Sequence, residues 1–390
     1  MTLLAFAVQC LTNLARRGLF IRNLQQLHCL RIDSADGEVD AELPAVTMIV
    51  PARNEEAGIE QAVRSMAALD YPGLEIIVLD DHSTDATPEI LDQLGSEFER
   101  VRVVHNPPIQ SGWLGKANAV WQGVLLSDPA RPWLVIADAD VVFHPKALRR
   151  AVAYATDQRL DYLTCVAYLD NGSFVEELML PVGWCAIIQG ARPDRLNHPR
   201  SQPIGVGAFV LVRRDAYLAS GGHSAICTLQ PEDTLLAGLI RRWGGTIGVV
   251  WTRDLMRVRL YRGYSQLKRF LVRKLRVQID DMPGRLLTRS VYVLLQDVLP
   301  MPLAVYAAAI QWAAGSFQVG LTLFALGALA SYLTNVLSFD QYRQVARMRR
   351  GIEWLHPLGG VLRLWFFASA VGQILTGQAM DWRGRRFVNG

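Results

Sequence analysis

The sequence predicts a doubly wound α/β domain with a mostly parallel sheet, followed by helices that lie on and cross a membrane. Two observations lead to this prediction. Between residues 45 and 142, apolar strand-like runs alternate with helical stretches, and acidic or glycine-rich turns follow the runs. From Val298 to Phe339 the chain has no charged residue, whereas the first 289 residues have the composition of an ordinary globular chain.

Strands and helices are expected to alternate through the first part of the α/β domain. The expected strands cover residues 45–50, 74–79, 101–104 and the apolar run that ends before Asp138. A helix over 57–69 is stopped by Tyr71-Pro72-Gly73, and a second helix follows Asp85. A third helix opens at Gly112-Trp113-Leu114-Gly115-Lys116.

After Pro145 the pattern loosens, but further elements are still recognisable. Extended segments are expected at residues 162–168, 205–212, 246–251 and 256–261. Helices are expected at residues 174–189, 215–220 and 230–243. The first of these helices is rich in Trp, Met and Leu, which suits an apolar cleft for an acceptor.

Basic and apolar residues predict how the other segments meet a membrane. Leu3 to Val8 is apolar, but arginines follow too soon for a span of ~20 residues, so an amphipathic helix on the membrane is expected there. A second amphipathic helix begins at Ser265. The predicted division is a membrane-associated segment with a linker, the α/β domain, the second amphipathic helix, and a membrane region with a basic tail, at residues 1–42, 43–263, 264–289 and 290–390.

Charge and cysteine usage narrow the compartment and the partners. The net charge is +4, and Arg241 to Arg289 holds thirteen Lys or Arg residues against three Asp. This basic block, just ahead of an apolar region, suits anionic headgroups of the cytoplasmic leaflet. No nucleic-acid partner is expected, because no stacking platform or recognised motif accompanies the block. The five cysteines show no paired spacing, which fits a reducing compartment and argues against a disulfide framework or a zinc site.

Two carboxylates mark the expected functional edge of the sheet. The apolar run from Trp133 to Ala137 ends in Asp138-Ala139-Asp140. Open α/β sheets bind ligands at the carboxyl ends of their strands, and two carboxylates there can hold a hard divalent cation against phosphate oxygens. For this motif alone, the alternative is a solvated acidic turn.

Taken together, five motifs resemble those of membrane-attached family 2 glycosyltransferases, in the family's order and approximate spacing over nearly the whole chain. They are Val50-Pro51-Ala52-Arg53-Asn54-Glu55, Asp80-Asp81-His82-Ser83-Thr84-Asp85, Asp138-Ala139-Asp140, Glu232-Asp233 and Gln266-Leu267-Lys268-Arg269-Phe270. The closing Asp381-Trp382-Arg383-Gly384-Arg385-Arg386 is similar to the tail of ceramide-glucosyltransferase-like and hopene-associated members. The resemblance implies a GT-A type fold and a nucleotide-sugar donor.

The resemblance also implies which residues hold the donor. The nucleotide would be bound by residues at strand ends, namely Pro51, Arg53, Glu55 and Asp81. Asp138 would lie at the ribose, and Asp140 would coordinate Mg²⁺ or Mn²⁺ against the diphosphate. Asp81 could instead cap the following helix, although Ser83 or Thr84 could do that.

Asp233 is the candidate general base. A carboxylate at a helix start could deprotonate the acceptor hydroxyl of an inverting transfer, typically for a gain of ~10²–10⁴-fold. Capping of the helix is its alternative role, which Glu232, on the acceptor side, could fill. Lys116 follows a glycine turn at a helix start and suits a phosphate, and its alternative is an ordinary solvated lysine.

The Gln-x-x-Arg-Phe motif departs from the family pattern at one position. By resemblance, Gln266 and Arg269 would hold the diphosphate, the latter in a bidentate way. Phe270 stands where the family has a tryptophan that lines the acceptor site. A lipid hydroxyl would tolerate this change better than a sugar acceptor would.

The predicted function is therefore inverting, metal-dependent transfer of a sugar from a nucleotide diphosphate, with UDP expected, to a membrane-lipid hydroxyl. A polysaccharide synthase would need more helices to build a channel. A polyprenyl-phosphate acceptor needs no base, so Glu232-Asp233 counts against it. A nucleotidyltransferase would carry a Gly-rich loop after the first strand, and a non-catalytic scaffold would not be expected to keep all four of Asp81, Asp138, Asp140 and Asp233.

Basic loops predict the topology at the cytoplasmic membrane, with the α/β domain on the cytoplasmic side. The stretches Val298–Trp312 and Val319–Leu337 are expected to form a hairpin that crosses and returns. Pro357–Gly377 is the poorer span because it contains Arg363, and an arginine at the bilayer centre costs at least ~2.5 kcal/mol. It is therefore expected to enter and leave on the same side.

Overall fold

The computed structural model describes residues 2–32, 43–180, 193–261, 263–281, 283–315, 317–378, 380–382 and 385–387. Its contacts divide the chain into two compact units that are both discontinuous in sequence. We call residues 25–170 and 191–260 the α/β unit, and residues 1–24, 171–190 and 261–390 the helical unit. The four-part division predicted above stays a prediction.

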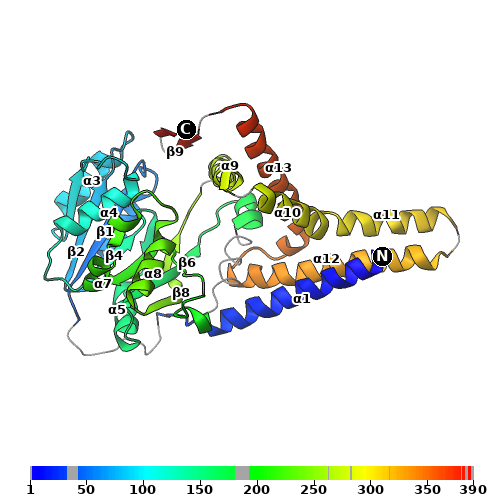
Figure 1. Cartoon of the computed structure of the whole chain (residues 1–390), viewed down its shortest axis with the longest axis horizontal. Helices are drawn as coiled ribbons and strands as arrows, with labels where there is room; N and C mark the ends of the chain where they lie inside the picture. The colour runs from blue at the N-terminus through cyan, green and yellow to red at the C-terminus, as the bar shows by residue number, and fades with distance from the viewer. Residues whose placement is uncertain are drawn as a thin grey trace. The chain divides into compact units, whose positions relative to one another are not determined.

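One eight-stranded sheet forms the centre of the α/β unit, with the strand order β3-β2-β1-β4-β7-β6-β8-β5 (Figure 1). The strands are β1 (Val46–Ala52), β2 (Leu74–Asp80), β3 (Val101–His105), β4 (Trp133–Ala137), β5 (Val141–Phe143), β6 (Tyr162–Leu169), β7 (Phe209–Arg213) and β8 (Ile247–Val258). Neighbours from β3 to β4 are parallel, as are β6 and β8, and the other pairs are antiparallel. This mixed sheet confirms the predicted fold class.

Helices cover the sheet because each carries an apolar face at helical spacing. They are α2 (Ile59–Ala67), α3 (Thr87–Glu97), α4 (Gly115–Leu126), α5 (Ala147–Asp157), α7 (Arg214–Ala219) and α8 (Glu232–Trp243), with short 3₁₀ turns η1 (Pro193–Arg195) and η2 (Gly222–Ile226). In α2, for example, Ile59, Ala62, Val63 and Met66 are buried, which is the i, i+3, i+4, i+7 pattern of one helix face.

The structure corrects several of the expected elements. The two extended segments expected at 246–251 and 256–261 are one strand, β8, whose register against β6 shifts between Ala167 and Tyr168. β5 and α5 were not expected, and residues 205–208 form a loop ahead of β7. Of the helix expected at 174–189, residues 174–180 are helical and the remainder lies outside the described residues.

The helical unit contains the long apolar helices. Its elements are α1 (Thr2–Gln26), α9 (Tyr264–Asp281), α10 (Pro283–Val293), the π-helical turn η3 (Leu294–Val298), α11 (Pro300–Ala313), α12 (Val319–Val345), η4 (Ile352–Leu355), α13 (His356–Leu375) and the strands β9 (Met380–Trp382) and β10 (Arg385–Phe387). Helix α9 begins one residue before the expected amphipathic helix.

Two helices of the described residues are long and apolar enough to cross a membrane, α12 and the segment Ile352–Leu375. The second of these covers all but the last two residues of Pro357–Gly377, which was expected to be the poorer span. The first arm of the expected hairpin, α11, is too short to cross a membrane alone. It is long enough only when it is joined to residues 286–298, from which it is bent by 47°. Length and composition alone therefore allow up to three spans.

Candidate active site

The carboxyl ends of β1, β2 and β4 converge at one edge of the sheet. From β1 the chain adds β2 and β3 on one side and then places β4 on the other, so β1 and β4 flank a topological switch point, where such sheets bind ligands. The β1–β4 ladder ends at Ile49 and Ile136. Pro51 and Asp138 lie two residues beyond these ends, at the same level of neighbouring strands.

The loops that follow β1 and β2 hold each other through their own motif residues. The Asn54 side-chain oxygen accepts the backbone N–H of Thr84 at 2.8 Å, and the Ser83 hydroxyl accepts the N–H of Asn54 at 2.9 Å. Asn54 and His82 adopt left-handed backbone conformations, with φ of 52° and 60°. The Arg53 guanidinium donates to the backbone carbonyl of Asp81. The two loops thus bring two predicted nucleotide-binding residues into contact.

Neighbouring aspartates in this region have different roles. Asp80 is buried, accepts the N–H of Ser83 at 3.0 Å and lies 3.1 Å from His105 Nδ1, so it is a structural residue. Neither Ser83 nor Thr84 caps helix α3. Its N-cap position is Ala86, which has no side-chain cap, and the carboxylate of the preceding Asp85 accepts the N–H of Thr87, the first helical residue, at 3.0 Å. Asp81 is therefore not needed as the cap.

Four predicted site residues come together in what we call the acid–lysine cluster: Lys116, Asp138, Glu232 and Asp233. Lys116 Nζ lies 2.8 Å from Asp138 Oδ1 and 2.7 Å from Glu232 Oε1, at the first turn of α4. The alternative interpretation of Lys116 as a solvated helix lysine is therefore wrong. Its predicted contact with a phosphate stays a prediction.

The backbone around Asp233 is fixed from two sides. The Tyr162 hydroxyl, from β6, donates to the Asp233 carbonyl at 3.2 Å. A Cβ on Gly205 would stand 2.2 Å from the Asp233 carbonyl carbon, so only glycine allows this close approach. The Asp233 carboxylate accepts the N–H of Thr234 at 2.7 Å. The start of α8 is therefore held firmly at the cluster.

Gly207 lines the space that the cluster surrounds. A Cβ at this position would stand 3.1 Å from Asp138 Oδ2, 3.4 Å from Lys116 Nζ and 3.6 Å from Asp233 Oδ2. Three functional groups from three different elements therefore face one point, where a side chain is lacking. A larger residue at position 207 would therefore crowd the cluster.

Burial and neighbouring charge set the protonation of the cluster. Burial, joined by the negative charge of Glu232, raises the pKa of Asp233 to about 6. The ammonium group of Lys116 opposes burial at Glu232 and lowers the pKa of that carboxyl. Asp233 can thus accept a proton near neutral pH, whereas Glu232 stays ionised and neutralises the lysine.

The residues at the end of β4 fit a divalent cation that is shared with a substrate. No group of three or more His, Cys, Asp or Glu side chains that could hold a metal exists among the described residues. Mg²⁺ characteristically uses one or two carboxylates and takes its other ligands from phosphates and water. Asp138 and Asp140 supply two carboxylates directly after β4, which matches that donor set.

The Gln-x-x-Arg-Phe residues lie on α9 in the helical unit. Gln266 and Arg269 are exposed, and the buried Leu267 between them marks the opposite face of the helix. The centroids of the Phe270 and Tyr261 rings are 4.9 Å apart. The Arg273 Cζ lies 5.4 Å from the Phe270 centroid. These residues belong to the helical unit and the acid–lysine cluster to the α/β unit, so their predicted contact with the diphosphate stays a prediction.

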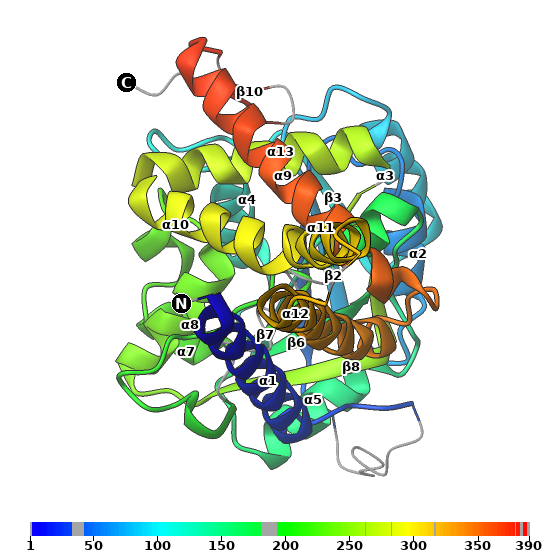
Figure 2. The same cartoon turned by 90° about the vertical axis from the view of Figure 1, so that its right-hand side faces the viewer.

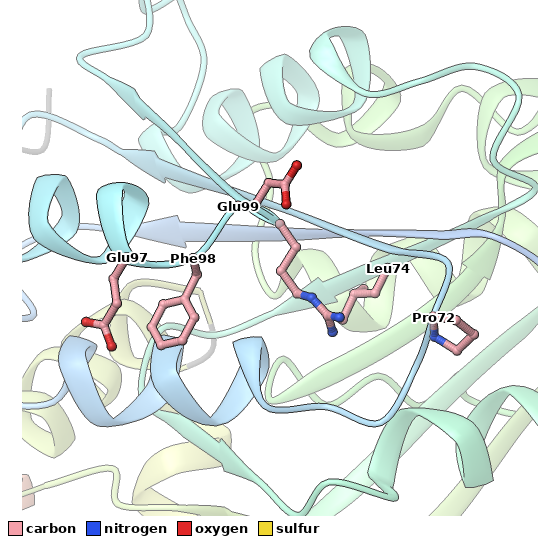
Figure 3. A pocket seen from close by; sticks show the side chains of 6 residues that line it. Pro72, Leu74, Glu97, Phe98 and Glu99 are labelled. Atoms are coloured by element: carbon pink, nitrogen blue, oxygen red, sulfur yellow. The ribbon is translucent and has the colours of Figure 1, made fainter.

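A hollow at the opposite edge of the sheet carries none of the predicted residues (Figure 3). It lies at the amino ends of β2 and β3 and is lined by Pro72, Leu74, Glu97, Phe98, Glu99 and Arg100. Ligand sites in such sheets form at the carboxyl ends, so we assign no function to it.

Sequence reasoning missed Gly205, Gly207 and Tyr162. The Gly205-Val206-Gly207 sequence immediately before a strand was a usable signal, because paired glycines there indicate a close approach of the backbone. Tyr162 had no comparable signal, since it lies in an ordinary apolar strand and reaches α8 only through the fold.

Comparisons with known proteins show which family and which fold the chain is similar to. Residues 47–219 match the family Glycosyl transferase family 2. The beta-monoglucosyldiacylglycerol synthase of Synechocystis sp. is 39% identical over 113 residues, 28% of this chain and 23% of that protein. The 4,4'-diaponeurosporenoate glycosyltransferase of Staphylococcus aureus is 26% identical over 222 residues, 56% of this chain and 54% of that protein. The matches thus span about a quarter to half of these relatives.

A solved structure has the same fold. The mannosyltransferase PcManGT from Pyrobaculum calidifontis, in complex with GDP-Man and Mn²⁺, superposes with a TM-score of 0.54 at 19% identity. The superposition covers 94% of this chain and 99% of that one. At this identity the likeness concerns the fold.

Proposed function

Because residues 47–219 form a family 2 glycosyltransferase domain, we propose that the chain transfers a sugar, with inversion, from a nucleotide diphosphate to a hydroxyl of a membrane lipid. The donor is expected to be a UDP-sugar. The observation that carries this proposal is the position of Asp233, whose carboxylate faces the same point beside Gly207 as Asp138 and Lys116.

The proposed donor site occupies the carboxyl edge of the sheet. The loops after β1 and β2 present Pro51, Arg53, Glu55 and Asp81 to the nucleotide. Asp138 follows β4 beside them and would lie at the ribose. Asp140 would hold Mg²⁺ or Mn²⁺, whose chemistry is to neutralise the negative charge that develops on the departing diphosphate. The Mn²⁺ in PcManGT supports a divalent cation here.

Asp233 is proposed to accept the proton of the acceptor hydroxyl as that oxygen attacks the anomeric carbon. Its pKa of about 6 leaves the carboxylate ionised at neutral pH while keeping it basic enough for this role. Glu232 is held by Lys116, so the two adjacent acids have separate functions. The bond from the anomeric carbon to the diphosphate breaks as the new glycosidic bond forms.

A lipid acceptor is supported by two observations. The relatives named above are a beta-monoglucosyldiacylglycerol synthase and a 4,4'-diaponeurosporenoate glycosyltransferase, and both names refer to lipid-related molecules. The chain also has apolar helices long enough to reach into a bilayer. We further propose a multi-pass location at the cytoplasmic membrane, with the α/β unit on the cytoplasmic side, where nucleotide sugars are found.

Reconstituted full-length protein tests the proposal. Vesicles that contain diacylglycerol, ceramide or neither are incubated with Mn²⁺ and a series of UDP- and GDP-linked hexoses, and the lipids are analysed by mass spectrometry. We expect a glycolipid from one donor, whose anomeric proton in the NMR spectrum shows the configuration opposite to the donor. Donor hydrolysis without any glycolipid would contradict the lipid acceptor, and a retained configuration would contradict the role of Asp233.

A further inference from the structure

We propose that α1 enters the bilayer beside α12, with its leucines toward lipid acyl chains and its amides toward the protein. The amphipathic pattern of the sequence predicted instead a helix that lies on the membrane. The inference rests on contacts within the helical unit and does not depend on the proposed reaction.

Helix α1 follows α12 in the same direction over most of its length. The Phe6 ring lies 5.2 Å from Phe324, centroid to centroid, and the Phe20 ring lies 4.9 Å from Tyr342. Between these contacts, the Asn13 amide donates to Thr334 at 3.3 Å. The three contacts are seven residues apart on α1, about 10 Å of helix each. If α12 crosses the membrane, α1 is carried into it.

Apart from the buried Phe20, α1 exposes leucines and buries amides. Gln9, Asn13 and Asn23 are buried, with at most 6% of each exposed, whereas Leu4 and Leu11 are 69% and 66% exposed. In water, a helix buries leucines and exposes amides. In a bilayer, the reverse arrangement places apolar side chains against acyl chains and lets amides bond to neighbouring helices.

The buried amides repair a break in the neighbouring helix. Pro300 has no N–H to donate to the carbonyl of Gln296, four residues earlier, and η3 forms at this point. The Asn335 amide of α12 donates to that carbonyl. The Gln9 amide lies 3.4 Å from the same oxygen and 3.4 Å from the Leu295 oxygen. Non-helical backbone at membrane depth requires such partners, because lipid supplies none.

Charges are aligned between the two helices. The apolar part of α1 ends at Arg16, whose guanidinium donates to the Tyr292 hydroxyl at 2.6 Å. The apolar part of α12 ends at Asp340 and Arg343. Since Phe20 already contacts Tyr342, the basic ends of both helices lie at one level. This places them at the same membrane surface, as the positive-inside tendency requires.

Helix α13 provides the contrast within the same unit. Figures 1 and 2 both show it running transverse to α11 and α12, which run lengthwise in the first view and toward the viewer in the second. Phe366 and Ala370 pack on Leu267 and Val272 of α9, and Arg363 is paired with Asp297. The stem that enters the bilayer therefore consists of α1, α11 and α12, and α13 rests on its surface.

Spin-label depth measurements test the inference. A single nitroxide is placed in turn at Leu4, Val8, Leu11 and Leu14 of the full chain, with its five cysteines replaced, in anionic lipid vesicles. We expect the ratio of oxygen to nickel-chelate accessibility to rise steadily from residue 14 to residue 4. Labels at Leu326 and Leu333 of α12 should show the same gradient, and labels at Leu358 and Val361 of α13 should share one shallow depth. A single shallow depth for all four α1 labels would overturn the proposal.

Substitution of the amide tests the repair separately. Gln9→Leu removes both contacts with the η3 carbonyls and should lower the midpoint of thermal unfolding in detergent by about 2 °C. Gln26→Leu, at the exposed end of the same helix, is the matched control and should leave the midpoint unchanged. Equal midpoints for the two variants would show that Gln9 does not stabilise the break.

Discussion

The α/β unit and the helical unit distribute polar and apolar side chains in opposite ways. In the α/β unit, aliphatic residues fill the sheet and its helices, and charged groups gather at one edge, where Lys116 lies between two acids. In the helical unit, leucines cover the outside of α1 and α12, and amides face inward. The first arrangement suits water, and the second suits lipid.

This difference shows that one chain can be adapted to two solvents even though the two units are not contiguous in sequence. Residues 171–190 of the helical unit lie between segments of the α/β unit, and α1 precedes them all. Solvent preference is therefore a property of the assembled unit. The following predictions test the comparison, beginning with the largest expected effect.

Asp233→Asn should lower turnover by about 10²–10⁴-fold while leaving donor affinity unchanged, because the amide cannot accept the acceptor's proton. Turnover and the dissociation constant for UDP with Mn²⁺ are measured on both proteins. A loss confined to donor affinity would contradict the assignment as base.

The same variant reveals how the site affects stability. The pKa of Asp233 is raised on folding, so its ionised form destabilises the fold above the unfolded pKa, and this effect disappears as the pH falls below that value. Asp233→Asn should therefore be more stable at pH 7.5, by at most about 3 kcal/mol, and show no gain near pH 3.

Leucine-to-lysine substitutions at two equally exposed positions compare the units directly. Leu326 on α12 and Leu125 on α4 are 56% and 59% exposed. Leu326→Lys places a charge in the bilayer and should weaken insertion by about 3 kcal/mol, measured as the membrane-bound fraction after alkaline extraction. Leu125→Lys should have no effect. Equal membrane-bound fractions for the two variants would contradict the proposed difference between the units.

Lys116→Met should reduce donor affinity about tenfold or more, since it leaves Asp138 and Glu232 without their shared cation beside the anionic donor. Binding of UDP in the presence of Mn²⁺ is measured by calorimetry. Lys146→Met removes an exposed lysine and serves as the control. If the two variants bind UDP equally, Lys116 has no part in donor binding.

The pH dependence of kcat/KM should show a single acidic limb with a midpoint near 6. Below this value protonated Asp233 cannot act as base, so the rate should fall about tenfold per pH unit, and above it the rate should be level. A profile that is flat from pH 5 to pH 8 would contradict the proposed protonation.

Asn54→Ala should cost about 1 kcal/mol more stability than Asn106→Ala, measured by urea unfolding of the full chain in detergent. Both asparagines have left-handed backbones, with φ of 52° and 47°, so the loss of backbone tolerance cancels in the comparison. Asn54 differs in its side-chain oxygen, which accepts the Thr84 N–H at 2.8 Å and the Thr84 hydroxyl at 3.4 Å. Equal losses would mean that this bond does not hold the loops together.

Local signals in the sequence were sufficient to predict the parallel half of the sheet and the acids at its edge. Strand ends such as Ala137-Asp138 are marked by an abrupt change from apolar to charged residues. This signal is local in the sequence and does not depend on tertiary contacts. β5 has only three residues, too few for a periodic signal, and β8 continues through the exposed Arg253 and Asp254 where the pattern suggests a break.

Long-range contacts could not be predicted in this way. Gly207 reaches the acid–lysine cluster because β7 pairs antiparallel with β4, and Tyr162 reaches Asp233 across the sheet. The orientation of α1 depends on a partner helix more than 300 residues away in the sequence. The role of its buried amides therefore becomes clear only when that helix is in place. The sequence therefore predicted its amphipathic character without indicating which face meets lipid.

The contact between Gln9 and η3 also has a consequence for synthesis. The two partners are separated by 287 residues, and the α/β unit is encoded between them. At 5–20 residues per second, a ribosome needs roughly 15–60 s to reach η3 after α1 is made. During this interval the leucines of α1 have lipid available, but its amides have no protein partner. We expect the nascent helix to wait at the bilayer surface, where water satisfies the amides, and to sink only when the hairpin of α11 and α12 arrives.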